Sequence, residues 1–284
     1  MSQTTAAANG SLPTVKGGFG EAPTVAVPDA DPPTDLVVKV LSKGDGADVA
    51  SGDVVVIDYL GVRWEDGSTF DSTFERGPTG YSLGGGAVPG WETGLVGVPV
   101  GSRLMMVTPP DQAFGDNPPI DAIQPGDTLV WVVDILGAHQ GDEAAKGQPA
   151  PTEDDSLPYV SITPKEPEIV IPKGDPTNKL ISIPVVVGDG PKVQKGQTLV
   201  VQYKGVLWRT GKEFDSSWSK GTPLVTPIGT GSVITGWDKG LVGQTVGSRV
   251  LLVVPPKDGY GNAGQGSIKG TDTMVFAVDI LGAY

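Results

Sequence analysis

The sequence predicts an α+β fold that occurs twice, with an antiparallel β-sheet packed on one short α-helix in each of two similar domains. Three observations lead to this prediction. The 284 residues include 42 glycines and 26 prolines, which favour turns and leave few stretches suited to long helices. The apolar segments are short and rich in β-branched residues. Finally, one half of the sequence resembles the other half along most of its length.

The internal repeat is visible in four blocks that recur in the same order roughly 145 residues later. Residues 54–62 correspond to 198–206, 70–72 to 214–216, 90–97 to 236–243, and 133–138 to 278–283. A repeat of this length indicates a duplicated domain, because solenoids and propellers repeat every ~20–50 residues. The similarity extends upstream, where residues 23–28 parallel residues 167–172, so we expect an additional edge strand in each domain.

Each expected element follows from local residue types. Strands are expected where β-branched and apolar residues run together between turn residues: 53–59, 100–108 and 128–136 in the first domain, and 197–203, 246–254 and 273–281 in the second. A hairpin turn is expected at residues 64–68, which contain Asp66-Gly67. Residues 91–97 and 237–243 space Trp, Leu and Val so that they share one face, which predicts one short helix in each domain.

The domain boundaries are predicted from composition. We expect the two domains at residues 16–139 and 159–284. Residues 1–15 are rich in Ser, Thr, Ala and Gly and predict a disordered lead. Residues 140–158 have little apolar content and an acidic run, as expected of a solvated Pro/Gly linker. The single histidine, His139, precedes this linker, and we expect it on the surface.

Composition excludes several classes of function. A net charge of -13 without any basic cluster disfavours nucleic acids and anionic membrane surfaces as partners. No apolar run approaches the ~20 residues of a transmembrane helix. With no cysteine and one histidine, the chain cannot supply a Ser-His-Asp triad to both domains or a histidine-based zinc site, so we expect no metal and no cofactor. Residues 259–264 match G-x-G-x-x-G but follow Pro255-Pro256 and precede a glycine-rich loop, so we interpret them as a turn.

Aromatic residues remain as candidates for a binding site. They occur at corresponding positions of the two copies: Tyr59, Phe70, Trp91, Phe114 and Trp131 in the first, and Tyr203, Phe214, Trp237, Tyr260 and Phe276 in the second. Such side chains can line an apolar pocket or fill a core, and aromatic content alone favours a core.

The motifs around these aromatic residues resemble those of FKBP-type peptidyl-prolyl cis-trans isomerases. The second copy contains Tyr203-x-Gly205, Phe214-Asp215-Ser216-Ser217, Val233-Ile234-x-Gly236-Trp237-x-x-Gly240 and Tyr260-Gly261. These motifs occur in the family's order and cover nearly all of each repeat. The resemblance implies a half-wrapped antiparallel sheet curled around a short helix, with a groove between them that accepts a prolyl ring.

The resemblance also implies roles for individual residues. In the second domain Trp237 would form the pocket floor, with Ile268 on an overhanging loop and walls from Tyr203, Phe214, Val233, Ile234 and Phe276. The main-chain N–H of Ile234 and the hydroxyl of Tyr260 would bond peptide carbonyls, while Asp215 would face the rotating amide. The corresponding pocket of the first domain comprises Tyr59, Phe70, Asp71, Val88, Trp91, Phe114, Ile123 and Trp131.

The two copies differ at several of these positions. The first copy has Phe114 where the second has Tyr260, and its Ala87-Val88 is smaller than Val233-Ile234. Both differences predict that the second domain is the more active. Against this, Arg76 occupies the position where the family often pairs an arginine with the aspartate, whereas the second copy has Lys220, which cannot make a bidentate contact. Thr79 and Leu224 stand where the family is often aromatic.

We therefore expect an enzyme that isomerises X–Pro bonds in unfolded or flexible polypeptides and assists their folding. The alternative is a non-catalytic proline-docking or chaperone module. The resemblance adds macrolides such as tacrolimus and rapamycin as possible ligands, and we expect a monomer. The Gly/Ser/Thr-rich lead is similar to that of secreted or lipid-anchored actinobacterial members of the family, so we expect an extracytoplasmic location with the signal segment removed, and a cytoplasmic one stays open.

Overall fold

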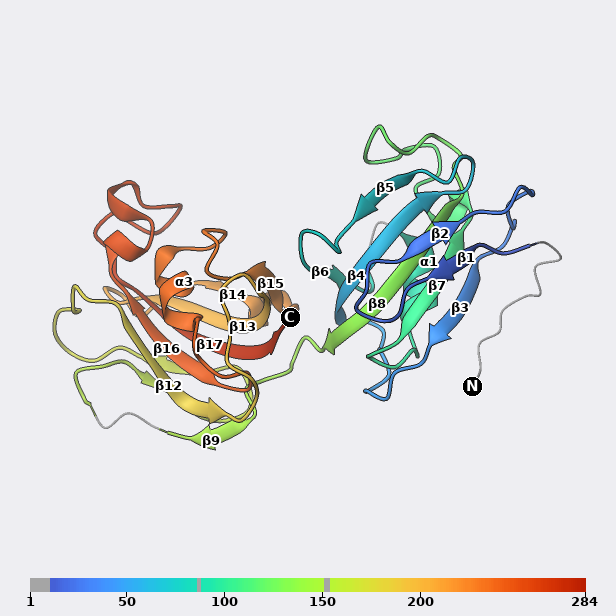
Figure 1. Cartoon of the computed structure of the whole chain (residues 1–284). Helices are drawn as coiled ribbons and strands as arrows, with labels where there is room; N and C mark the ends of the chain where they lie inside the picture. The colour runs from blue at the N-terminus through green and yellow to red at the C-terminus, as the bar shows by residue number, and fades with distance from the viewer. Residues whose placement is uncertain (1–10, 86–87, 151–153) are drawn as a thin grey trace. The chain divides into compact units, whose positions relative to one another are not determined.

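A computed structural model describes residues 11–85, 88–150 and 154–284 of the chain (Figure 1). The chain divides into two compact units, the first ending at Ala138 and the second beginning at His139. Each unit contains one main antiparallel sheet with a short helix on one face, so the predicted fold class is confirmed. Within the described residues, no helix is long and apolar enough to cross a membrane.

The main sheet of the first unit has the strand order β3-β7-β8-β4-β5, and β6 also pairs with β4. Its elements, in chain order, are β3 (Val37–Ser42), β4 (Val54–Arg63), β5 (Thr69–Ser72), β6 (Thr79–Ser82), α1 (Pro89–Leu95), β7 (Arg103–Thr108), η1 (Pro110–Gln112) and β8 (Leu129–His139).

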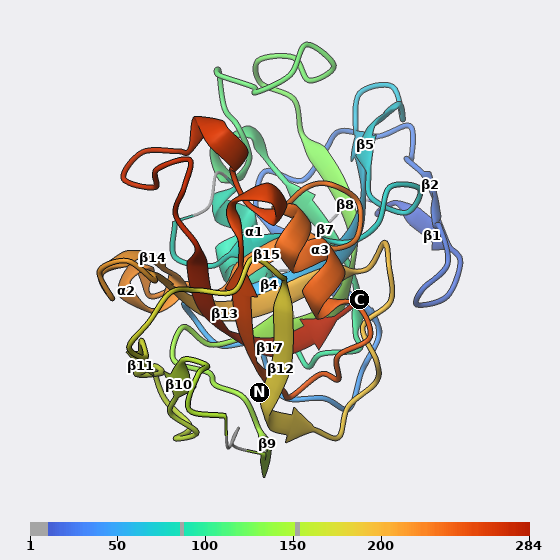
Figure 2. The ribbon, with the colours of Figure 1, turned by 90° about the vertical axis from the view of Figure 1, so that its left-hand side faces the viewer.

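The main sheet of the second unit has the order β14-β13-β17-β16-β12-β9, and β15 pairs with β13. Its elements are β9 (Gly147–Pro149), β12 (Ile181–Gly188), β13 (Thr198–Leu207), β14 (Glu213–Ser216), α2 (Ser217–Lys220), β15 (Leu224–Pro227), α3 (Thr235–Leu241), β16 (Arg249–Val254), η2 (Pro256–Asp258), η3 (Gly261–Ala263) and β17 (Met274–Ala283). Helix α3 packs on β16 and β12 (Figure 2).

Both faces of each sheet are covered, which explains why the central strands read as continuous apolar runs. In the second unit the inner cluster joins the sheet to Trp237 and Leu241 of α3. The outer cluster lies under a two-stranded hairpin, β10 (Tyr159–Val160) and β11 (Ile169–Val170). The first unit has the same arrangement, with the hairpin of β1 (Thr14–Lys16) and β2 (Thr24–Ala26) on the outer face.

The upstream segments therefore differ from the expectation of edge strands, because β2 and β11 pair only within these separate hairpins. The buried guanidinium of Arg249 holds the second hairpin through the carbonyls of Ser161, Thr163 and Lys165, at 2.7, 2.9 and 2.7 Å. Arg103 similarly bonds the carbonyls of Gly17 and Glu21. Each hairpin thus supplies acceptors for the donors of a buried arginine.

The segments expected to be unstructured are partly ordered. Residues 1–10 of the expected lead lie outside the described residues, but Thr14–Lys16 forms β1. Within the expected linker, Gly147–Pro149 forms β9 and pairs with Val186, Val187 and Gly188 of β12. A Cβ on Gly147 would lie only 2.2 Å from the Val187 carbonyl oxygen, so glycine permits this close approach.

His139 corrects a second expectation, because only 6% of it is exposed. Its Nδ1 lies 2.9 Å from Glu143 Oε2, and its Nε2 lies 2.8 Å from the Tyr284 hydroxyl. Sequence analysis missed this burial because one of these two partners, Tyr284, lies 145 residues away in the sequence.

The two helices are confirmed, although each begins and ends two residues before its predicted bounds. Val88 and Ile234 are the N-cap residues, so the backbone is already turning when it reaches the tryptophan. Gly97 and Gly243 adopt φ values of 81° and 89° after the helices, a conformation that stops a helix. The four-residue α2 was not predicted.

Candidate functional site

The predicted pocket residues of the second domain gather around the tryptophan that begins the first turn of α3. Trp237 is buried, and its ring centroid lies 5.2 Å from that of Tyr203 and 5.5 Å from that of Phe276, both in edge-to-face geometry. Phe214 lies 5.5 Å from Phe276. The other predicted residues Val233 and Ile234, just before the helix, and Ile268, in the segment that follows η3, belong to the same inner cluster.

The first domain repeats this arrangement with larger rings. Trp131 of β8 replaces Phe276 and lies 5.0 Å from Trp91 and 5.1 Å from Phe70. Tyr59 lies 5.4 Å from Trp91, and Phe114 lies 6.4 Å from Trp131. Val88 and Ile123 belong to the same cluster. Seven of the eight residues predicted for the first pocket therefore belong to this cluster. The eighth, Asp71, lies at the edge of the cluster, where it accepts a hydrogen bond from the Tyr59 hydroxyl.

Tyr260 stands apart from the second cluster. It is 37% exposed and immediately precedes η3, and none of its ring contacts joins it to Trp237 or Phe276 within the described residues. Its counterpart Phe114 is half-buried against the first cluster. The tyrosine side chain is consequently partly exposed, whereas the phenylalanine packs against the first cluster.

The two aspartates each bind a tyrosine and a cation. In the second domain the Tyr203 hydroxyl donates to Asp215 Oδ2 at 2.6 Å, and Lys220 donates to Asp215 Oδ1 and, at 3.3 Å, to the Tyr203 oxygen. In the first domain Arg76 contacts both oxygens of Asp71, as well as the Tyr59 oxygen at 3.1 Å. The predicted bidentate pairing in the first domain is confirmed, and the single ammonium contact in the second is confirmed as well.

These contacts keep both carboxyl groups ionised at neutral pH. The hydrogen bond from Arg76 lowers the pKa of Asp71, against the opposing effect of burial. Burial raises the pKa of Asp215, but hydrogen bonds from Lys220 and Tyr203 outweigh it, so the net shift is downward. Each aromatic cluster therefore has at its edge an ionised carboxylate that is paired with a cation.

The tryptophans of the two aromatic clusters share an unusual feature. Within the described part of the chain, the Nε1 atoms of Trp91 and Trp237 are buried and have no hydrogen-bond partner, as is also true of Trp218. Buried donors without an acceptor are uncommon in native proteins. Two of these three indole N–H groups therefore occur at corresponding positions in the two aromatic clusters.

Sequence analysis missed two residues that shape these sites. Tyr81 of β6 lies 4.9 Å from Trp91, ring centroid to ring centroid, and adds a ring to the first cluster. Asp238 of α3 accepts hydrogen bonds from the backbone N–H groups of Gly229 and Gly231, at 2.7 and 2.8 Å, and so fixes the loop that leads to Val233 and Ile234. The alternation of β6 could have indicated Tyr81, whereas the loop contacts of Asp238 leave no periodic signal.

Glycines behind the aromatic walls give the first testable prediction. A Cβ on Gly205 would lie 2.7 Å from Phe214 Cζ and 2.9 Å from Phe276 Cε1, so alanine would displace two walls of the second pocket. We expect Gly205→Ala to lower the free energy of unfolding by about 1–3 kcal/mol through overpacking. Urea denaturation measures this loss, and Gly85→Ala, where a Cβ would meet nothing within 4 Å and φ is not positive, is the matched control. A stability equal to that of wild type would contradict the close packing.

A second prediction concerns alkaline pH. Burial, followed by the hydrogen bonds to Asp71 and Asp215, raises the pKa of Tyr59 and of Tyr203 to about 12. Burial and the charge of Glu143 raise the pKa of Tyr284 to about 12. A raised pKa stabilises the fold fully below the ordinary value of 10.0, and this stabilisation is lost as pH rises toward about 12.

We therefore expect tyrosinate absorbance to show a late step near pH 12, with the free energy of unfolding falling between about pH 10 and 12. Tyr203→Phe should remove part of that late step. A titration that is complete well before pH 12 in the folded protein would contradict the burial of these hydroxyls.

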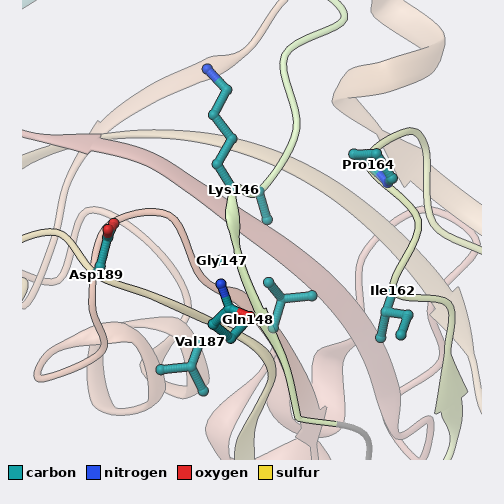
Figure 3. Close-up of a pocket in the computed structure, with 9 residues that line it drawn as sticks. Lys146, Gly147, Gln148, Ile162, Pro164, Val187 and Asp189 are labelled. Atoms are coloured by element: carbon teal, nitrogen blue, oxygen red, sulfur yellow. The ribbon is translucent and has the colours of Figure 1, made fainter.

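A separate cavity of about 350 Å³ lies in the second unit beside β9 and β12 (Figure 3). It is lined by Ala145, Lys146, Gly147, Gln148, Ile162, Pro164, Val186, Val187 and Asp189. None of these residues belongs to the aromatic cluster. The cavity is thus distinct from the candidate site.

Comparisons with known proteins find similar sequences over both domains. The profile of the family described as FKBP-type peptidyl-prolyl cis-trans isomerase matches residues 46–136 and 190–281. An FK506-binding protein of Streptomyces anulatus is 44% identical over 119 residues, which cover 41% of this chain and 96% of that protein. Peptidyl-prolyl cis-trans isomerase FKBP9 of Mus musculus is 33% identical over 218 residues, covering 76% of this chain and 32% of that protein. The crystal structure of AtFKBP13 is 35% identical and covers 37% of this chain and 93% of its own, with a TM-score of 0.35.

Proposed function

Because the chain belongs to the family of FKBP-type peptidyl-prolyl cis-trans isomerases and is an enzyme of that class, we propose that its second domain is the main catalyst. In this proposal the domain isomerises X–Pro bonds in unfolded or flexible polypeptides and thereby assists their folding. The prolyl ring would enter the cluster of Tyr203, Phe214 and Phe276 above Trp237.

The reaction requires no nucleophile and no general base. Rotation about the C–N bond is opposed by amide resonance, with a barrier of about 18–20 kcal/mol. An apolar pocket removes water from the amide carbonyl and disfavours the charge-separated resonance form that keeps the amide planar. Contacts that hold the twisted amide better than the planar one then lower the barrier. An acceleration of about a million-fold needs roughly 8 kcal/mol of such differential binding.

The observation that supports the second domain most is its pair of accessible donors. In the described structure the N–H of Ile234 has no protein acceptor, and the hydroxyl of Tyr260 is on an exposed side chain. Both are assigned to peptide carbonyls in this proposal. The first domain has Phe114 in place of the tyrosine, and its Val88 N–H has an internal acceptor, the Tyr81 hydroxyl. Ala87, the other smaller residue of that pocket, lies outside the described residues.

Asp215 contributes in this proposal through charge and position. Its carboxylate orients the Tyr203 hydroxyl at the pocket edge, where the rotating amide would lie. In the twisted amide the nitrogen no longer donates electrons to the carbonyl carbon, so a carboxylate close to that carbon would stabilise the twisted form electrostatically without transferring a proton. Asp71 is placed equivalently, but its second oxygen is also engaged by Arg76.

The first domain lacks the tyrosine hydroxyl, and its Val88 N–H already has an acceptor, which favours a different role for this domain. We propose that the first pocket docks proline-containing segments with little catalysis, so that one client chain is held while the second pocket acts on it. Macrolides of the kind that the name of the Streptomyces relative indicates are proposed as ligands of the second pocket, where Leu224 supplies an aliphatic rather than an aromatic wall.

The proposal predicts a moderate effect of a single hydroxyl. We expect Tyr260→Phe to lower kcat/KM for a short X–Pro peptide about 2- to 10-fold, the equivalent of one hydrogen bond. Tyr159→Phe, at a 54% exposed tyrosine outside both clusters, is the matched control. An unchanged kcat/KM in Tyr260→Phe would contradict the assigned role, and an uncatalysed rate in wild type would contradict the proposed function itself.

A further inference from the structure

The first pocket contains a tyrosine whose hydroxyl is bonded to the backbone at the start of its helix. Tyr81 OH lies 3.3 Å from the Val88 nitrogen, from which it accepts a hydrogen bond, and 3.3 Å from the Val88 carbonyl oxygen, to which it donates. Its ring is tilted by 57° against Trp91, at a centroid distance of 4.9 Å. The side chain thus bridges the pocket floor and the N-cap residue of α1.

The second domain has no counterpart of this bridge. Strand registers align the two positions, because Tyr81 pairs with Val55 of β4 and Thr226 pairs with Leu199 of β13. The hydroxyl of Thr226 lies 3.4 Å from the carbonyl oxygen of its own neighbour, Pro227. In the part of the chain that the structure describes, the Ile234 N–H therefore meets no side-chain oxygen.

Trp237 has fewer aromatic neighbours than Trp91, although 4% of each side chain is exposed. Its ring neighbours are Tyr203 and Phe276, whereas Trp91 contacts Tyr59, Trp131 and Tyr81. A peptide that approaches Trp91 must therefore also contact the Tyr81 ring. It must also displace the Tyr81 hydroxyl before its carbonyl can accept the Val88 N–H.

We propose that Tyr81 is an internal competitor of the peptide in the first pocket, and that it sets the difference in affinity between the two domains. This inference rests on the proposed function, in which a peptide carbonyl accepts the N–H of Ile234 or Val88. The tyrosine hydroxyl accepts a hydrogen bond from the Val88 N–H and donates one to the Val88 carbonyl. Both backbone groups therefore already have a partner when no peptide is bound. Binding there exchanges one hydrogen bond for another and gains correspondingly less.

The substitution Tyr81→Phe tests the contribution of the hydroxyl alone. The substitution keeps the aromatic contact with Trp91 but removes the oxygen that bonds Val88. Because bonds of 3.3 Å are long, the competition is modest. We expect the affinity of the first pocket for a proline-containing peptide to rise about 2- to 10-fold, which corresponds to one net hydrogen bond.

The experiment uses the ¹⁵N-labelled full chain titrated with a short peptide that contains one X–Pro bond. The backbone amides of Val88 and Ile234 report the two pockets separately in one sample. In wild type we expect the Ile234 amide to shift at lower peptide concentration than the Val88 amide. In Tyr81→Phe the Val88 titration should move to about 2- to 10-fold lower peptide concentration while that of Ile234 stays unchanged. Tyr159→Phe, which removes an exposed hydroxyl elsewhere, should alter neither titration.

Two results would overturn the inference in distinguishable ways. If Ile234 responds but the Val88 titration in Tyr81→Phe is unchanged or weaker, the hydroxyl is no competitor, and the proposed function is untouched. If neither amide responds in wild type and the chain does not accelerate isomerisation of the same peptide, the proposed function fails and this inference fails with it.

Discussion

Replacing Arg249 by methionine is expected to lower the free energy of unfolding of the second domain by about 3–5 kcal/mol, because it leaves a buried carboxylate without its partner. Only 1% of either side chain of the Arg249–Asp279 pair is exposed. Arg249 Nε and Nη2 lie 2.6 and 2.7 Å from the two Asp279 oxygens. The variant also deprives three hairpin carbonyls of their donor, so the hairpin of β10 and β11 should detach from the sheet.

Hydrogen exchange of the full chain measures this loss at the amides of β16 and β17, and limited proteolysis between residues 159 and 170 reports the hairpin. Lys204→Met is the matched control, because the Lys204–Glu166 pair is more exposed and a surface pair contributes about 1 kcal/mol or less. Arg249→Lys keeps the positive charge but cannot make the bidentate contact of the guanidinium. Its loss of stability should therefore lie between those of Arg249→Met and Lys204→Met. A loss for Arg249→Met as small as that of Lys204→Met would show that the pair does not hold the hairpin.

Replacing Asp215 by alanine is expected to lower kcat/KM about 10- to 100-fold, the range of a hydrogen bond to a charged group. The carboxylate is ionised, binds the Tyr203 hydroxyl at 2.6 Å and lies at the edge of the aromatic cluster. Its removal leaves that hydroxyl without its acceptor and removes the negative charge from the edge of the pocket. Stopped-flow isomerisation of a short X–Pro peptide measures the effect.

In the same assay, Asp215→Asn removes the negative charge but keeps the size and shape of the side chain. The amide oxygen can still accept from Tyr203, but the charge is lost, so we expect a smaller loss of kcat/KM than for alanine. Asp189→Ala, in the cavity beside β9 and β12, removes a carboxylate outside the aromatic cluster and should leave kcat/KM unchanged. Equal rates for wild type and Asp215→Ala would exclude a role of this carboxylate in the reaction.

The sequence alone predicted those features that depend on short, repeated patterns. The run at residues 53–59 predicted a strand that the structure places at Val54–Arg63. The aromatic residues that converge on Trp91 and Trp237 were assigned to one pocket in each copy through the resemblance to the family, because aromatic content alone favoured a core. The pairing of Asp71 with Arg76 was likewise predicted from the resemblance to the family, in which an arginine often pairs with the aspartate.

Features that depend on contacts between distant segments were missed. Arg103 and Arg249 follow Gly-Ser in both copies, yet a charged residue at the start of a strand gives no sign that it is fully buried. His139 was expected on the surface because its cover comes from Glu143 and from Tyr284, which lies 145 residues away. Tyr81 was overlooked because its partner is a backbone group rather than a complementary side chain.

The central claim, that the second pocket is the main catalyst, is tested most directly by comparing Asp215→Ala with Asp71→Ala in the full chain. The rate of X–Pro isomerisation is measured for both variants and for the double variant at matched enzyme concentrations. We expect Asp215→Ala to remove most of the activity and Asp71→Ala to change it little, with the double variant close to Asp215→Ala. The opposite order, in which Asp71→Ala removes most of the activity, would contradict the account.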